Sequence, residues 1–263
     1  DGKQAILWRY FPKAYFALEG LLVNQFSKIL SCNSESIQLY QHLYPSLVDR
    51  INYYRNSVDT EIFYPLPFVQ KEVTRRQFSQ KMGLSEETRF ILFAGRLHPQ
   101  KDPILLVRSF AALDFENAHL LIAGDGELAD EVRSEITRLG LTHKITMLGS
   151  QSRNQLAYFQ QISSACVLTS AYEGLPIVVL EALASGTPIV TTRCGETPKI
   201  LTAESGIVCD ERSPETIAKA FQIILEYPEK FPVEACTKVA APYSANLVIQ
   251  KIYSDMLNRW KPE

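Results

Sequence analysis

Short apolar runs alternate with longer amphipathic segments from residue 89 onward. The apolar runs predict β-strands at 89–94, 118–123, 144–148, 165–169, 188–192 and 207–209. The segments between them predict helices at 102–113, up to 139, and at 155–161, 176–184 and 213–227. Strands that are apolar throughout, rather than at every second position, indicate a sheet covered on both faces. The pattern therefore predicts an α/β fold with a doubly wound, Rossmann-like parallel sheet.

The first 64 residues follow a different pattern. They predict helices at 13–26 and 35–43 and strands at 28–32 and 51–54. Two strands are too few for a Rossmann-like domain, so this part is predicted to be a partial N-terminal domain. Further predictions are a linker and charged helix at 65–88, a main domain at 89–240, and a closing C-terminal helix at 241–263, amphipathic over 244–260.

Composition narrows the classes of partner. The chain has 263 residues, of which 46% are hydrophobic and 21% charged, with a net charge of −2. A nearly neutral chain has no broad basic field to attract nucleic acid, so no nucleic-acid partner is expected. The five cysteines are scattered, odd in number and without a CxxC pair. This favours a reducing compartment, hence a cytoplasmic protein without a disulfide framework or zinc site.

The N-terminal segment leaves two interpretations open. No apolar run approaches the length that spans a bilayer. Residues 6–30 mix aromatic, leucine and basic residues, which suits a packed amphipathic helix or, less well, a helix at the inner face of a membrane. A peripheral membrane contact is therefore the alternative to packing. The chain begins with Asp1 and shows no signal peptide, which predicts a fragment of a longer protein.

A carboxylate interrupts the helix predicted at 176–184. Glu181 lies in an otherwise apolar run, and a buried carboxylate is costly unless it has a partner. Glu173 stands before the helix, and Gly174 allows a ligand to approach exposed backbone N–H groups. These features indicate a ligand with both hydroxyl and phosphate groups, such as a nucleotide sugar. The alternative is a structural ion pair between Glu181 and a nearby Lys or Arg.

Two cations follow the strand at 89–94. Gly95 permits a tight turn, and Arg96 and Lys101 lie on the same strand-to-helix loop. Ligands of open parallel sheets gather at the carboxyl ends of the strands. There Arg can bind a diphosphate through two hydrogen bonds and Lys as a point charge. Two solvated loop cations are the alternative interpretation.

Residues 124–129 match the GxGxxA form of a dinucleotide fingerprint. Glu127, Asp130 and Glu131 at the start of the following helix would repel a pyrophosphate, although they suit the helix dipole. The next strand lacks the acidic residue that binds a ribose. A dehydrogenase is therefore disfavoured, and a tight turn is the preferred interpretation of Gly124-Asp125-Gly126.

The sequence gives little support for a metal site or for nucleophilic catalysis. The four histidines show no metal spacing, and only His98 lies near the predicted site, while His119 is expected to pack within a strand. No Ser-His-Asp or Cys-His arrangement is readable, so nucleophilic hydrolysis is not indicated.

Taken in order, these motifs resemble glycosyltransferase family 4. The resemblance rests on Gly95-Arg96-Leu97 with Lys101, Ile122 to Gly126, Glu173-Gly174-Leu175-Pro176 ending at Glu181, and Ala184 to Val190. The two glutamates eight positions apart, with seven residues between them, are the specific element. Upstream, Asn56-Ser57-Val58-Asp59 with Phe63 is similar to a further motif of the family, with Ser57 in place of glycine.

The resemblance implies a two-domain GT-B architecture, of which this chain is the donor-binding half with the tail of the acceptor domain (residues 1–64). It implies a retaining glycosyltransferase of polysaccharide or glycolipid biosynthesis. Such an enzyme transfers a sugar from a nucleotide-diphosphate sugar to a hydroxyl acceptor, a glycan or glycolipid, with no metal or other cofactor. Arg96, Lys101 and Glu173 are the implied catalytic residues. The implied donor-binding residues are Gly95, Arg96, Lys101, Glu173, Gly174, Leu175, Pro176, Ile177 and Glu181. In this assignment Arg96 and Lys101 hold the diphosphate, Glu173 the sugar and Glu181 the ribose.

Two departures from the family pattern bear on activity. Most of the acceptor domain is missing, which predicts a chain that is inactive alone, and Lys199 follows Pro198 where many members carry glutamate. Two rival functions stay open. One is a non-catalytic nucleotide-sugar-binding subunit that needs a separate acceptor chain, and the other is a sugar-nucleotide epimerase of GT-B shape.

Overall fold

The computed structural model describes residues 11–259 and divides the chain into two compact units. The first is Asp1–Asn56 and the second is Ser57–Glu263. Predictions that fall on residues 6–10, and on Trp260 at the end of the closing helix, lie outside the described part.

The second unit is built on a six-stranded parallel sheet with the order β5-β4-β3-β6-β7-β8. Its strands are β3 (Arg89–Ala94), β4 (Ala118–Ala123), β5 (Ile145–Gly149), β6 (Ala165–Leu168), β7 (Ile189–Thr192) and β8 (Gly206–Cys209). Its helices are α3 (Phe68–Lys81), α4 (Pro103–Ala111), α5 (Ala129–Arg138), α6 (Arg153–Ile162), α7 (Ile177–Ala184), α8 (Thr197–Ile200), α9 (Pro214–Glu226), α10 (Val233–Ala240) and α11 (Ala245–Arg259), with the short η4 (Pro228–Lys230) and η5 (Ala241–Tyr243). The predicted α/β fold with a doubly wound parallel sheet is confirmed.

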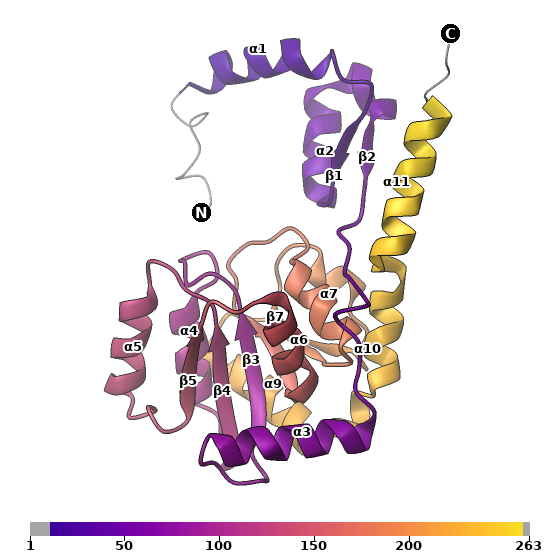
Figure 1. Ribbon diagram of the computed structural model, residues 1–263. Helices are drawn as coiled ribbons and strands as arrows, with labels where there is room; N and C mark the ends of the chain where they lie inside the picture. The colour runs from indigo at the N-terminus through magenta and orange to yellow at the C-terminus, as the bar shows by residue number, and fades with distance from the viewer. Residues whose placement is uncertain (1–10, 260–263) are drawn as a thin grey trace. The chain divides into compact units, whose positions relative to one another are not determined.

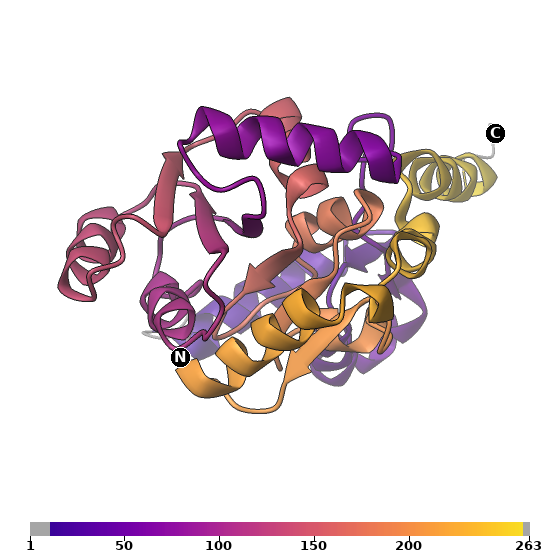
Figure 2. The same cartoon turned by 90° about the horizontal axis from the view of Figure 1, so that it is seen from below.

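Helices cover both faces of this sheet (Figures 1 and 2). On one face, α4, α5 and α9 pack on the sheet through a core that includes Phe93, Leu106 and Phe221. On the other face, α3, α6, α7 and α10 bury side chains of the intervening positions, such as Phe90 and Cys166. Burial on both sides explains why the strands are apolar at every position.

The strand order reverses between β3 and β6. From β3 the chain moves outward through β4 and β5, whereas β6, β7 and β8 follow one another in the opposite direction. β3 and β6 pair directly, with Phe93 opposite Val167. The connections that leave these two strands therefore diverge to opposite faces of the sheet. Such a reversal opens a crevice at the carboxyl ends of the strands, where ligands of this fold class bind.

The first unit contains a two-stranded parallel sheet. It comprises α1 (Pro12–Val23), β1 (Ile29–Ser31), α2 (Ser34–Leu43), η3 (Pro45–Arg50) and β2 (Ile51–Tyr53). The side chain of Asn33 caps α2 by accepting hydrogen bonds from two backbone N–H groups. A small apolar cluster joins Val23, Ile37, Leu47 and Ile51. Leu18 and Leu21 of α1 remain more than half exposed, and the membrane contact predicted for this segment stays a prediction.

Several elements differ from the sequence prediction. Pro176 precedes α7 instead of lying in its first turn, because its ψ of 131° is extended. The helices α8, of four residues, and α10, of eight residues, were not predicted from the sequence, and neither begins with a side-chain cap. The closing helix forms as α11, and Leu247, Tyr253 and Met256 on it are more than half exposed. Within residues 11–259, no helix combines the length and apolarity needed to cross a membrane.

Candidate functional site

Two loops meet at the carboxyl ends of β3 and β6. The loop after β3 carries Gly95 to Asp102, and the loop after β6 carries Thr169 to Pro176. The backbone N–H of Ala171 donates to the carbonyl oxygen of Gln100 at 2.8 Å. The side-chain amide of Gln100 donates to the carbonyl oxygen of Tyr172 at 2.9 Å. These bonds hold the two predicted halves of the site together.

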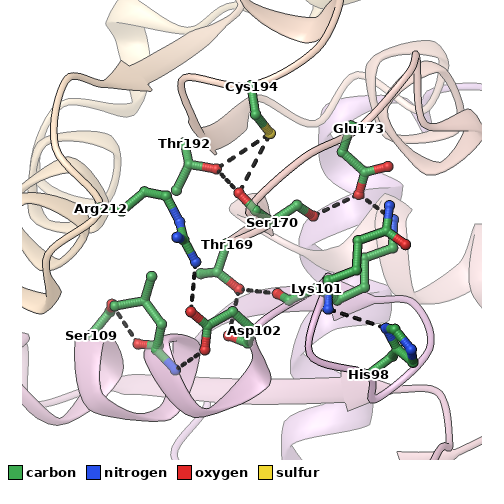
Figure 3. A network of polar contacts seen from close by, with 12 residues as sticks. His98, Lys101, Asp102, Ser109, Thr169, Ser170, Glu173, Thr192, Cys194 and Arg212 are labelled. Atoms are coloured by element: carbon green, nitrogen blue, oxygen red, sulfur yellow. Dashed lines mark hydrogen bonds and ion pairs between the residues drawn. The ribbon is translucent and has the colours of Figure 1, made fainter. Parts of the chain in front are cut away.

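Lys101 and Glu173 form an ion pair across these loops (Figure 3). The Lys101 ammonium group contacts Oε1 of Glu173, and the Ser170 hydroxyl donates to the same oxygen at 2.6 Å. The Glu173 side chain is only 8% exposed, whereas that of Lys101 is 21% exposed. The predicted phosphate cation and the predicted sugar-binding carboxylate therefore lie side by side, and each neutralises the other in the ligand-free protein.

The turn that carries Lys101 has a special backbone conformation. Asp102 has φ 47° and ψ 62°, and it is the one non-glycine residue with positive φ in the described part of the chain. Its Oδ1 accepts from the N–H of Leu105 at 3.1 Å and caps α4. The Thr169 hydroxyl lies 2.7 Å from the carbonyl oxygen of Lys101 and 3.0 Å from that of Asp102. A left-handed residue costs about 1–2 kcal/mol unless local hydrogen bonds support it, as they do here.

A cavity of about 420 Å³ lies at the carboxyl ends of β3, β4 and β5. Its lining includes Gly95, Arg96, Asp125, Gln151 and Val178. The Arg96 side chain is exposed and lines this cavity, and its role as a phosphate-binding cation stays a prediction. The Cε atom of Lys101 lies 3.8 Å from the position that a Cβ on Gly95 would take, so the second cation borders the same turn.

The Gly124-Asp125-Gly126 loop supports this cavity by close backbone packing. A Cβ on Gly124, which has φ 145°, would lie 1.9 Å from the carbonyl oxygen of Gly95. One on Gly126 would lie 2.4 Å from that of Leu97. The N–H of Leu97 donates to the carbonyl oxygen of Asp125 at 3.0 Å. The loop is therefore a turn whose glycines permit contact with the Gly95 loop, in agreement with the tight-turn interpretation.

Glu181 is buried in α7 without a protein partner. It is 8% exposed, and the described residues provide neither a hydrogen bond nor an ion pair to its carboxylate. Burial raises the pKa of Glu181 to about 7, although the charge of Arg153 acts in the opposite direction. The structural ion pair that the sequence left open is therefore not formed within the described part. Burial, and to a lesser extent the charge of Glu181, raises the pKa of the Cys166 thiol to about 12.

The remaining predicted residues form the connection into α7. A Cβ on Gly174 would meet no atom within 4 Å, so its backbone is open to a ligand. Leu175 is 3% exposed and Pro176 is buried, and both anchor the loop to the core. Ile177 is 51% exposed and opens α7, whose first turn has no side-chain cap. Backbone N–H groups at an uncapped N-terminus favour an anionic ligand.

A third loop, which follows β7, contacts the backbone of the Glu173 loop. The N–H of Glu196 donates to the carbonyl oxygen of Gly174 at 2.9 Å. Gly195 has φ 64°, and a Cβ there would lie 2.4 Å from the same oxygen. Lys199, which departs from the family pattern, pairs with Glu196 at 3.1 Å.

In the described part of the chain, the histidines and acidic groups do not assemble a metal centre. No group of three or more His, Cys, Asp or Glu residues within 11–259 is placed to hold a metal ion. His98 accepts from the N–H of Gln100 at 3.1 Å and lies 3.7 Å from the carboxylate of Glu127. His119 is buried in β4 as predicted, and burial lowers its pKa to about 4.

Comparison with known proteins identifies the family. The model of the glycosyl transferases group 1 family matches residues 74–236, a range that includes every residue discussed above for the site. The chain belongs to this family. The predicted resemblance to glycosyltransferase family 4 and its GT-B fold is thereby confirmed.

Two curated relatives match this chain over part of their own length. It is 35% identical over 143 residues to an uncharacterized glycosyltransferase of Methanocaldococcus jannaschii, covering 54% of this chain and 37% of the relative. It is 28% identical over 211 residues to the D-inositol 3-phosphate glycosyltransferase of Corynebacterium glutamicum, covering 76% and 50%. The match thus spans half or less of the length of these two relatives.

Solved structures show the same fold at low sequence identity. Anabaena HepE in complex with UDP-glucose matches with a TM-score of 0.77 at 18% identity, covering 95% of this chain and 69% of HepE. The C-terminal domain of a glycosyl transferase group 1 family protein from Francisella tularensis matches with a TM-score of 0.62 at 20% identity. That match covers 72% of this chain and 99% of the domain.

The structure also brings in residues that the sequence did not single out. Ser170 holds Glu173, Thr169 holds the Lys101 turn, and Arg212 contacts Asp102 at 2.6 Å. Thr169 lies 68 residues from Lys101, and Arg212 lies 110 residues from Asp102, so only the strand order brings these pairs together. Ser170 lies just after the end of β6, which has no motif of its own. A polar residue directly after an apolar strand was the one signal for Thr169 and Ser170.

Proposed function

We propose that this chain binds a nucleotide-diphosphate sugar at the carboxyl ends of β3 and β6. In this proposal it is the donor half of a retaining glycosyltransferase that transfers the sugar to a hydroxyl group of a glycan or glycolipid. The observation that carries the proposal is Glu181, a buried carboxylate without a hydrogen bond or ion pair among the described residues. It lies in the helix that follows the Lys101–Glu173 pair, where a ligand rich in hydroxyl groups would supply the missing donors.

The diphosphate is assigned to Arg96, Lys101 and the start of α7. Arg96 lines the cavity, and Lys101 borders the same turn at Gly95. When the sugar leaves, negative charge develops on the diphosphate, and two cations with uncapped N–H groups are suited to stabilise it. Lys101 must then exchange its contact with Glu173 for one with phosphate.

The hydroxyl groups are assigned to the two glutamates. Glu181 accepts hydrogen bonds from the ribose, and Glu173 accepts them from the sugar. Release of Lys101 towards phosphate frees one oxygen of Glu173, while Ser170 still orients the carboxylate at 2.6 Å. HepE, whose fold this chain shares, has been solved with UDP-glucose, which supports a nucleotide sugar as the donor.

The chain alone is proposed to bind the donor without appreciable transfer. Transfer needs donor and acceptor held together in near-attack geometry, and the chain matches half or less of the two curated relatives. The same coverage favours the second candidate, a non-catalytic nucleotide-sugar-binding subunit whose acceptor half is a separate chain. The two candidates share the donor site and differ in where the acceptor domain is encoded.

Calorimetric titration with UDP-glucose, GDP-mannose and ADP-glucose tests the proposal, with glucose and mannose as controls. At least one sugar nucleotide should bind, whereas the free sugars should not. If none binds, the proposed site is wrong. Incubation of the chain with the bound donor and a panel of hydroxyl acceptors tests the second point, and robust turnover would show that the chain is a complete transferase.

A further inference from the structure

The loop after β8 reaches the turn that carries Lys101. Arg212 stands between β8 and α9, and its Nη2 donates to Oδ2 of Asp102 at 2.6 Å (Figure 3). The two residues are 110 positions apart in sequence. Asp102 divides its carboxylate between two tasks, because Oδ1 caps α4 while Oδ2 meets the guanidinium group.

Helix stability does not account for this arginine. Arg212 immediately precedes Ser213, which caps α9, and it contacts the residue that caps α4. The N-terminus of a helix carries partial positive charge, so a cation beside two such termini is unfavourable. The pair is also part exposed, with side-chain exposures of 39% for Arg212 and 32% for Asp102, and such pairs contribute little to folding.

The contact between Arg212 and Asp102 can instead fix the position of the turn that carries Lys101. Asp102 holds the left-handed conformation that turns the chain directly after Lys101. Thr169 fixes the two carbonyl oxygens of this turn from the β6 side, and Arg212 fixes the carboxylate from the β8 side. Loss of either support would widen the range of directions open to the Lys101 ammonium group.

We propose that Arg212 is a positioning residue for donor binding, which holds Asp102 and thereby directs Lys101 towards the donor diphosphate. The inference rests on the proposed function, because Lys101 must be a phosphate ligand for its direction to matter. Arg212 itself makes no contact with phosphate in this account.

A double-mutant cycle tests this role. The affinity of the tightest binder among UDP, GDP and ADP is measured calorimetrically for wild type, Arg212→Ala, Lys101→Ala and the double variant. Arg212→Ala should weaken binding about three- to tenfold, because a charge-assisted hydrogen bond then no longer orients the turn. In the Lys101→Ala background the same substitution should change affinity by less than about twofold, since residues that act as a unit are not additive.

A matched control comes from the neighbouring strand end. Arg193 pairs with Asp210, and its side chain is 62% exposed. Arg193→Ala removes a similar arginine–aspartate pair and should leave nucleotide affinity within about twofold of wild type. Arg212→Lys keeps the charge and should restore part of the lost affinity. Circular dichroism and the thermal midpoint report whether each variant is folded.

The outcomes separate the two proposals. If Lys101→Ala leaves affinity unchanged, the diphosphate assignment fails and the role of Arg212 fails with it. If Lys101→Ala weakens binding but Arg212→Ala does not, the diphosphate assignment stands and only the positioning role is overturned. Equal losses from Arg212→Ala in both backgrounds would also overturn it, because they would show that Arg212 binds the ligand independently of Lys101.

Discussion

Glu181 carries a carboxylate into a helix whose neighbouring side chains are apolar or small. Val179, Leu180 and Ala182 around it are fully buried, and Glu181 itself is 8% exposed. Burial raises the pKa of Glu181 to about 7, and no described residue offers the carboxylate a hydrogen bond, so the protonated acid predominates in the ligand-free protein below pH 7. At the scale of the residue, burial of the Glu181 carboxylate therefore has a free-energy cost that a hydrogen-bond donor from a ligand would reduce.

This burial predicts a specific dependence of stability on pH. The pKa of Glu181 is about 7 in the folded protein, against 4.5 for the unperturbed group. A raised pKa means that the folded state binds the proton more tightly, so this contribution to stability is lost as pH rises from about 4.5 to 7. Glu181→Gln cannot ionise and should exceed wild type in free energy of unfolding at pH 8, by on the order of 2 kcal/mol. Urea unfolding should show a much smaller difference near pH 4.5, and an equal difference at both pH values would contradict the assignment.

The two glutamates should separate in binding assays. Glu181→Gln removes the proposed ribose acceptor and should weaken both the free nucleotide and the sugar nucleotide. Glu173→Gln should weaken only the sugar nucleotide, because it also releases Lys101 from its ion pair and leaves the cation available to phosphate. Titration of both variants with UDP and UDP-glucose, or with the corresponding pair for whichever nucleotide binds, measures the loss of affinity for each ligand. Equal losses for both ligands in both variants would refute this division of roles.

At the scale of the elements, the site depends on backbone contacts between loops that follow different strands. The Gly95 loop rests on the Gly124 loop, and the Glu173 loop rests on the loop at Gly195. Each contact requires a missing Cβ, since a side chain there would lie less than 3 Å from a carbonyl oxygen. The glycines are thus part of how the sheet presents its cations and carboxylates.

Gly124→Ala should therefore affect both stability and binding. The added Cβ would lie 1.9 Å from the carbonyl oxygen of Gly95, which forces the Arg96 turn to move. We expect a loss of about 2 kcal/mol or more in the free energy of unfolding, together with weaker nucleotide binding. Gly140→Ala is the control, since Gly140 has φ 69° but no atom within 4 Å of a Cβ. It should lose about 1 kcal/mol to backbone strain and keep its nucleotide affinity. Similar losses of affinity in both variants would argue against the loop contact.

The sequence predicts the elements better than it predicts their contacts. The six strands follow from apolar runs, and the helices α4 and α9 follow from a first-turn proline and a polar cap, all of which are local features of the sequence. The short helices α8 and α10 lack such caps. The pairing of Lys101 with Glu173, and of Asp102 with Arg212, depends on β3 and β6 being neighbours and on α4 lying beside α9. No local pattern contains that information, although the rule for parallel strand ends placed Arg96, Lys101 and Glu173 at one edge.

At the scale of the whole molecule, the candidate site belongs entirely to the second unit. The six-stranded sheet is covered on both faces, and its site lies within Ser57–Glu263. The helix α11 carries exposed apolar side chains, among them Tyr253 and Met256. In this account, donor binding does not require sugar transfer. Donor binding can therefore be measured on this chain alone.

The most direct test is calorimetric titration of UDP, GDP and ADP into wild type, Arg96→Ala and Lys101→Ala, with Arg193→Ala as the control. Hydrogen bonds to charged groups contribute about 1.5–3 kcal/mol, which corresponds to a loss of about tenfold or more in affinity. The account predicts that at least one of the three diphosphates binds, that both site variants lose this affinity, and that the control does not. Binding with unchanged affinity in both site variants, or no binding of any diphosphate to wild type, would contradict it.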